Sequence, residues 1–192
     1  ADDPAWRNRT LRVVSAALPL LEEAIGVPYP VAGPLVVEES VTASSDLPGE
    51  LLSEGPRLLA GYDQPPFTLV HQLGHLWLTP ELVADRWISE GFASSFAAVV
   101  ADDVAAGTDV EPPYDPDRRR GNLADDAFPL VSWGAGESTP AQDAFAYAAS
   151  WAVADEIGSL VGVDALRRAW SRIAAGIGPY APAAEDGSGR PA

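Results

Sequence analysis

The two histidines of this chain, His71 and His75, stand four residues apart in the stretch FTLVHQLGHLWL. Residues at positions i and i+4 of a helix lie one above the other on the same face, so two imidazoles with this spacing can bind one metal ion. A tetrahedral catalytic zinc site needs a third protein ligand, often a carboxylate, and leaves its fourth position to water. Glu90, in the later stretch WISEGFASSF, is the candidate for that ligand. The pattern favours a zinc site formed by these three residues.

Gln72 follows the first histidine, at the position where the zinc-peptidase motif H-E-x-x-H has a glutamate. That glutamate acts as a general base and takes a proton from the attacking water. A glutamine side chain donates and accepts hydrogen bonds but does not titrate, so Gln72 cannot fill this role. Losing a general base typically lowers a rate by about 10²–10⁴-fold. We therefore expect a zinc-binding domain that is inactive or a very weak hydrolase.

Two helices joined by a short turn must position these ligands. Residues 63–78 predict the first helix, with Asp63 as its cap and two prolines in its first turn, where no amide donor is needed. Pro80 prevents this helix from continuing, and Thr79 can cap a second helix that begins at Pro80. If the two helices are antiparallel, Glu90 on the second returns toward the histidines.

The remaining elements surround this pair. A helix is expected from residue 3 to Gly26, with a kink or break at Pro19. The other expected elements are short strands in 34–41 and 57–62, an irregular stretch over 107–140, helices near 140–158 and 162–176, and a disordered linker or tail over 181–192. The fold class is therefore α+β and mainly helical, with a small N-terminal sheet followed by a helical bundle in one domain over residues 1–180.

Composition excludes several classes of function. The formal net charge of −16 argues against binding to nucleic acid or to an anionic membrane surface, because both require basic patches. The chain contains no cysteine, so a metal must be held by histidine and carboxylate. It also contains no methionine, which indicates a processed or excised segment. We expect it to be part of a larger protein; the compartment is unknown, and we favour an extracytoplasmic domain.

The strongest family resemblance lies in HQLGHLWLTPELVADRWISEGFASSF, residues 71–96. This stretch resembles the alanyl/leucyl aminopeptidase-like gluzincins, which are zinc metallopeptidases with a thermolysin-like catalytic domain and the pattern W-x-N-E-G-F-A around their last ligand. Only fourteen residues separate His75 from Glu90, so the turn between the helices is shorter than in the family. Weaker similarity extends over about residues 5–175. The resemblance implies a thermolysin-like (zincin) fold that binds Zn²⁺, with Gln72 at the position of the general base.

The resemblance implies roles for two further residues. Tyr147 falls at the place of a tyrosine that hydrogen-bonds the tetrahedral intermediate in the family; alternatively, it is an aromatic residue packed against Trp151. Asp46 lies where the family carries a G-A-M-E-N stretch, whose glutamate binds the substrate's free α-amine. Asp46 is one methylene shorter and the rest of that motif is absent, so it is alternatively an ordinary turn or edge residue.

Three interpretations of the whole chain remain open. The one we favour is a zinc-binding pseudo-peptidase that acts in binding or scaffolding, with a peptide or protein segment as its partner. The second is an active zinc peptidase in which Gln72 is an engineered change, or in which another carboxylate such as Glu81 or Asp85 serves as base. The third is a metal-free structural helical domain in which the histidines pack against or cap helices.

Overall fold

The computed structural model of this chain describes residues 3–40, 50–52, 55–79, 82–105 and 125–176. The elements, in order, are α1 (Pro4–Ile25), β1 (Val36–Glu39), β2 (Glu50–Leu52), β3 (Gly55–Ala60), α2 (Pro66–Gly74), α3 (Arg86–Ala105), the 3₁₀ helix η3 (Leu130–Ser132), α4 (Pro140–Val161) and α5 (Val163–Ala174). The described part is mainly helical with one small sheet, as the sequence predicts. The expected tail over 181–192 lies outside it.

The sheet has the strand order β1–β3–β2. β3 is central: it pairs in parallel with β1, where Val36 lies opposite Arg57, and antiparallel with β2. Leu58 and Ala60 alternate along β3 and are both buried, which places them on the face covered by the helices. β1 falls within the predicted stretch 34–41, and β3 overlaps the predicted stretch 57–62 but begins and ends two residues earlier; β2 was not predicted.

α1 begins and ends as its sequence predicts. The Asp3 side chain accepts hydrogen bonds from two backbone N–H groups of the first turn, and Gly26 ends the helix in the left-handed region at φ 77°. Of the kink or break expected at Pro19, the break is wrong, because α1 is continuous from Pro4 to Ile25. Its buried face includes Ala17 and Leu21.

α5 covers the C-terminal end of α1. Arg167 Nε donates to the Ala24 carbonyl at 3.5 Å, and Ser171 Oγ donates to the Gly26 carbonyl at 2.9 Å. These bonds use carbonyl groups that a helix end leaves without a partner inside the helix. A Cβ on Gly26 would lie 2.8 Å from Arg167 Cβ, so a larger residue would obstruct this contact.

Both helices that carry the candidate ligands begin later than predicted. The N-cap of α2 is Pro65, which makes no side-chain cap, and Asp63 instead lies in a turn closed by a hydrogen bond from Gln64 N to Gly61 O. The prediction that Asp63 caps this helix is wrong. The prediction that Thr79 caps the next helix is also wrong: its carbonyl accepts from Leu82 N and Val83 N in a turn, and α3 begins only at Arg86.

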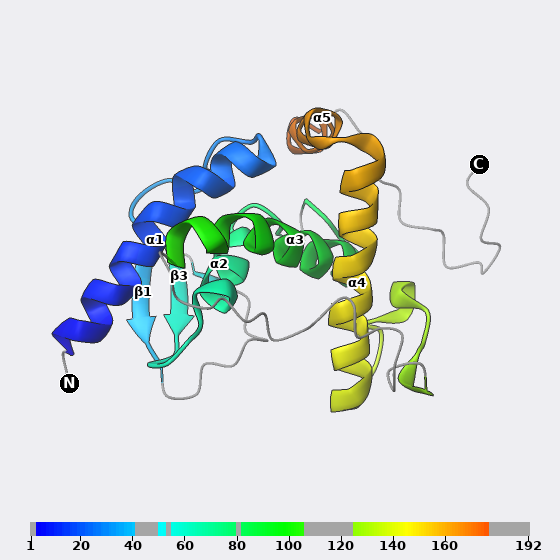
Figure 1. The fold of residues 1–192 in the computed structure, drawn as a ribbon, viewed down its shortest axis with the longest axis horizontal. Helices are drawn as coiled ribbons and strands as arrows, with labels where there is room; N and C mark the ends of the chain where they lie inside the picture. The colour runs from blue at the N-terminus through cyan, green and yellow to red at the C-terminus, as the bar shows by residue number, and fades with distance from the viewer. Residues whose placement is uncertain (1–2, 41–49, 53–54, 80–81, 106–124, 177–192) are drawn as a thin grey trace.

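α3 lies at the centre of the helical layer and packs against α1, α2 and α4, with α1 and α4 on opposite sides (Figure 1). The contact with α4 is close at Gly91, where an added Cβ would lie 2.4 Å from the Ser150 carbonyl oxygen. A side chain at this position would therefore force the two helices apart. Glu90 immediately precedes this contact, so α4 fixes the part of α3 that carries it.

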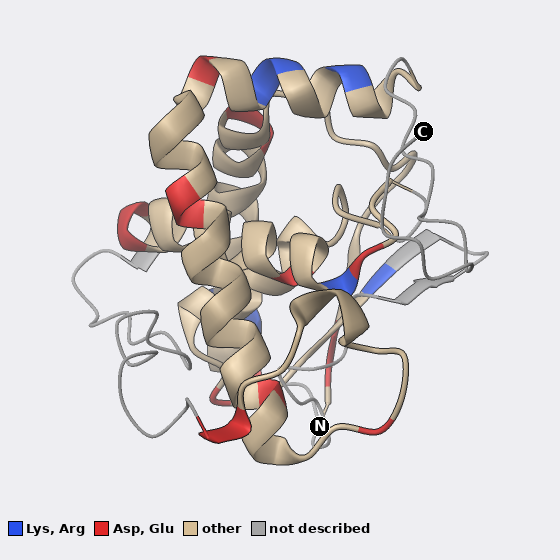
Figure 2. Ribbon diagram, turned by 90° about the vertical axis from the view of Figure 1, so that its right-hand side faces the viewer, with Lys and Arg blue, Asp and Glu red and all other residues tan. Residues whose placement is uncertain are grey.

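Acidic residues occur on most of the described elements, and α5 carries Asp164 together with three arginines (Figure 2). Among the described residues, no helix is both long enough and apolar enough to cross a membrane.

Candidate metal centre

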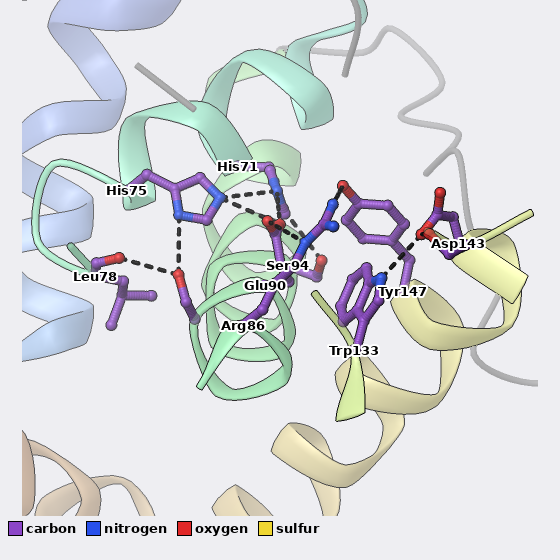
Figure 3. A network of polar contacts seen from close by, with 11 residues as sticks. His71, His75, Leu78, Arg86, Glu90, Ser94, Trp133, Asp143 and Tyr147 are labelled. Atoms are coloured by element: carbon purple, nitrogen blue, oxygen red, sulfur yellow. Dashed lines mark hydrogen bonds and ion pairs between the residues drawn. The ribbon is translucent and has the colours of Figure 1, made fainter. Parts of the chain in front are cut away.

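His71, His75 and Glu90 converge on one point, as the sequence predicts (Figure 3). His71 Nε2 lies 3.1 Å from Glu90 Oε2, His75 Nε2 lies 3.3 Å from the same oxygen, and the two Nε2 atoms are 3.2 Å apart. In the part of the chain that the structure describes, this is the group of side chains that could hold a metal ion.

Local backbone structure brings the two imidazoles together. His71 lies in the last turn of α2, and His75 is the C-cap residue, with φ −68° and ψ −9°. Because these angles remain helical, the i, i+4 relationship holds although the helix ends at Gly74. The imidazole rings meet edge to face with their centroids 5.0 Å apart. Glu90 reaches the same point from the second turn of α3.

The three ligand atoms have the spacing of one face of a tetrahedral zinc site. Zinc–nitrogen and zinc–oxygen bonds of about 2.0–2.1 Å place tetrahedral ligand atoms about 3.3–3.4 Å apart. The observed triangle has sides of 3.1, 3.2 and 3.3 Å. A proton on one of these atoms points toward one neighbour, whereas a cation above the triangle contacts all three. The geometry therefore fits a metal ion.

Ser89 fixes the tautomer of His75. Its hydroxyl donates its single proton to the Leu78 carbonyl at 3.0 Å, so its oxygen can only accept from His75 Nδ1, which lies 3.2 Å away. Nδ1 of His75 therefore carries a proton, and in the neutral ring Nε2 presents a lone pair to the site. A hydrogen bond at the far ring nitrogen is the usual way in which proteins orient a metal-binding histidine.

Ser94 plays the matching part for His71, with its Oγ 3.1 Å from His71 Nδ1. Both serines lie on α3, beside Glu90, so one helix provides the carboxylate and supports both imidazoles. Sequence reasoning missed these serines. The signal that indicates Ser94 is its position four residues after Glu90, on the same face of α3.

Glu90 is largely buried, with 14% of its side chain exposed. Burial by itself would raise the pKa of its carboxyl group, but hydrogen bonds with His71 and His75 and their charge lower that pKa well below its usual range. In the absence of metal, protons on the imidazoles stabilise the carboxylate; a metal ion would replace them. The site is therefore arranged to keep Glu90 ionised.

Gln72 is almost fully buried, with 1% exposure, and forms part of an amide chain. Gly61 N donates to Gln64 Oε1 at 2.8 Å, which directs Gln64 Nε2 toward Gln72 Oε1 at 2.7 Å. The carbonyl oxygen of Gln72 is thus tied to the end of β3. Nothing in this arrangement gives Gln72 a titratable group.

Tyr147 lies beside the ligand group but contacts it through Arg86. Its hydroxyl accepts a hydrogen bond from Arg86 Nη2 at 3.2 Å, and Arg86 Nε is 3.8 Å from Glu90 Oε1. The Tyr147 ring packs edge to face on Trp133 with centroids 4.8 Å apart, while Trp151 packs against Phe67. Sequence reasoning missed Arg86 and Trp133, because their importance follows from contacts between distant segments.

Three other carboxylates were considered from the sequence: Asp46, Glu81 and Asp85. Asp46 and Glu81 lie outside the described residues. Asp85 precedes α3 and is not a member of the group that could hold a metal ion.

Comparisons with protein-family models, curated proteins and solved structures found no match. What the site can do must therefore be inferred from its own atoms. Two imidazoles and one carboxylate, without thiolate, form a donor set suited to zinc and to other divalent first-row metals.

Proposed function

We propose that this chain is a zinc-binding, thermolysin-like domain of the gluzincin type, similar to the alanyl/leucyl aminopeptidase-like metallopeptidases, that lacks effective peptidase activity and acts in binding or scaffolding. The observation that carries the proposal is the triangle of His71 Nε2, His75 Nε2 and Glu90 Oε2, with sides of 3.1–3.3 Å. Its edges match those of a three-residue zinc site.

The supporting hydrogen bonds favour a metal site over a structural histidine pair. Ser89 leaves the His75 Nε2 lone pair directed at the carboxylate of Glu90, which is an unfavourable arrangement for two acceptors unless a cation or a proton lies between them. A zinc ion bound there would supply Lewis-acid chemistry, polarising a carbonyl group and making water more acidic. His71, His75 and Glu90 would hold the ion.

Gln72 supports the loss of activity. A working peptidase of this type needs a carboxylate there to take a proton from water and deliver it to the leaving amine, and an amide does neither. The Gln72 oxygen already accepts a hydrogen bond from Gln64 at 2.7 Å. The side chain contributes to the packing between α2 and the end of β3, and it provides no proton transfer.

Tyr147 does not compensate for the missing base. It corresponds to the family position for stabilising a tetrahedral intermediate, and a phenol that accepts a hydrogen bond from Arg86 at 3.2 Å can still donate its own proton. Stabilising an intermediate does not replace the proton transfer that Gln72 cannot perform. Retained metal ligands without the proton-transfer group are consistent with a binding role. The expected partner is a peptide or protein segment, and the domain is expected to function within a larger protein.

One observation favours an active peptidase as a second candidate. Arg86 contacts both Tyr147 and Glu90, so the tyrosine to which the family resemblance assigns intermediate stabilisation lies beside the candidate metal site. This function requires a base other than Gln72, for which Asp85 and Glu81 are the nearby carboxylates in the sequence.

Metal content and turnover, measured on the same preparation, test the proposal. After dialysis against a zinc-containing buffer and desalting, we expect about one zinc per chain, and hydrolysis of aminoacyl and peptide substrates at background. Glu90→Gln and His75→Gln should reduce the zinc content, whereas Glu38→Gln, which changes a glutamate paired with Arg57 in the sheet, should not. A wild-type protein that is folded, free of zinc and unchanged in melting temperature by a chelator would refute the zinc site.

A further inference from the structure

We propose that Arg86 is a positioning residue that keeps Glu90 bound to the metal through one oxygen only, and so preserves an open coordination position for a ligand. The inference rests on the proposed zinc site. It starts from a difference between the two oxygens of Glu90. Oε2 faces both imidazoles at 3.1 and 3.3 Å, whereas Oε1 faces the Arg86 guanidinium, with Nε 3.8 Å away.

Arg86 and Glu90 are four residues apart on α3, and this spacing alone would give a weak surface ion pair. Here the guanidinium is held by further contacts. Its Cζ lies 4.2 Å from the centroid of the Trp133 ring, and its Nη2 donates to Tyr147 OH at 3.2 Å. The guanidinium is therefore held both by α4, through Tyr147, and by the segment that precedes α4, through Trp133.

The partners of Arg86 are fixed in turn. Trp133 Nε1 donates to Asp143 Oδ1 at 2.9 Å, which sets the orientation of the indole. The backbone turns directly after the indole at Gly134, whose φ of 94° lies in the left-handed region that favours glycine. Figure 3 shows the guanidinium between Glu90 on one side and Tyr147 and Trp133 on the other.

The arrangement has a consequence for the number of zinc ligands. A carboxylate can bind a metal through one oxygen or through both, and zinc sites expand from four to five ligands when another donor is near. A cation fixed beside Oε1 attracts that oxygen away from the metal. Without this cation, Oε1 is free to become a ligand and to fill the position that a substrate or partner group would occupy.

Cobalt substitution measures this directly, because the visible d–d absorption of high-spin Co²⁺ weakens as its coordination number rises. We compare wild type with Arg86→Met, which keeps the stem and removes the charge, and with Arg86→Lys, which keeps a charge. Arg86→Gln replaces the methionine variant if that protein does not fold, as judged by circular dichroism. The spectra are recorded at saturating Co²⁺, so a difference between variants in their affinity for Co²⁺ does not change the amount of bound metal. Arg57→Met removes an arginine that pairs with Glu38 on the sheet and serves as the matched control.

The expected result is a clear loss of absorption intensity per bound Co²⁺ in the neutral Arg86 variants, with wild-type intensity in Arg57→Met and recovery of most of it in Arg86→Lys. If the spectra of the neutral variants superimpose on that of wild type, the inference is overturned. It is also overturned if Arg86→Lys folds and has the same absorption intensity per bound Co²⁺ as Arg86→Met. A wild-type protein that binds no Co²⁺ and no Zn²⁺ would instead refute the metal site itself.

Discussion

The Ser89 hydroxyl accepts a hydrogen bond from His75 Nδ1 at 3.2 Å because its own proton is used at the Leu78 carbonyl. Ser89→Ala removes this acceptor, so the ring can rotate and adopt the other tautomer. We expect the affinity for zinc to fall by about 10–100-fold, the usual effect of losing such a partner. Competition with a chromophoric chelator measures it. Ser95→Ala, on the same helix but bonded to Asp155, should bind zinc like wild type, and equal losses in both variants would contradict the role of Ser89.

Replacing Gly91 should separate α3 from α4. In Gly91→Ala the new Cβ would lie 2.4 Å from the Ser150 carbonyl oxygen, and relief requires movement of the backbone. We expect a loss of about 1–3 kcal/mol or more in the free energy of unfolding, measured by urea denaturation. Gly158 lies within α4, and in Gly158→Ala the nearest atom to the new Cβ is Leu166 Cδ2 on α5, 4.0 Å away. The free energy of unfolding of Gly158→Ala should rise by about 0.5–1 kcal/mol. If both variants were destabilised by the same amount, a specific contact at Gly91 would be contradicted.

Restoring a carboxylate at position 72 tests whether the expected inactivity comes only from the missing general base or also from the lack of a cleft that binds substrate. We expect zinc-loaded Gln72→Glu to keep its metal and still to hydrolyse peptides at background, because the hydrogen bond from Gln64 would stabilise a carboxylate at this position and make it a weaker base. Initial rates with aminoacyl and peptide substrates provide the measurement. A rise of about 10²-fold or more, the contribution of a general base, would instead show a competent cleft and favour the active peptidase.

The stability of the metal-free protein should decrease with acidification through Glu90. Its pKa in the folded protein lies below the value of about 4.3 expected in the unfolded chain, so the unfolded chain binds this proton more readily. Ionised Glu90 therefore stabilises the fold above pH ~4.3, and this contribution is lost as the pH falls from there through the folded-state pKa. With chelator present, the free energy of unfolding of wild type should fall more steeply in that range than that of Glu90→Gln. If the free energies of unfolding of the two proteins changed with pH at the same rate in that range, the contribution assigned to Glu90 would be contradicted.

The sequence was sufficient to predict that His71, His75 and Glu90 converge, because the pattern that brings them together is largely local. Two histidines at i and i+4 lie on one side of a helical turn, and a second helix that returns along the first brings Glu90 back to them. The two ends of α1 were equally predictable from the sequence, since Asp3 and Gly26 have clear capping chemistry. The start of α3 was not: Thr79 precedes a proline and suits an N-cap, yet its carbonyl closes a turn and the helix begins at Arg86.

The surroundings of the site depend on contacts that the local sequence does not encode. Arg86 and Tyr147 are 61 positions apart, and nothing about either residue alone indicates that one donates to the other. The same is true of Gln64, which determines the orientation of the Gln72 amide only because the chain turns between β3 and α2. Such partners become visible once the elements are packed.

The contact between α1 and α5 sets an order for folding. Ser171 bonds to the carbonyl of Gly26 across 145 positions and Arg167 to that of Ala24 across 143, so these helices meet only by closing a very long loop. Contacts between such distant segments slow folding, because the entropy of closure is lost before the contacts form. During synthesis, these two bonds to the end of α1 therefore cannot form until the segment around residues 167–171 has left the ribosome.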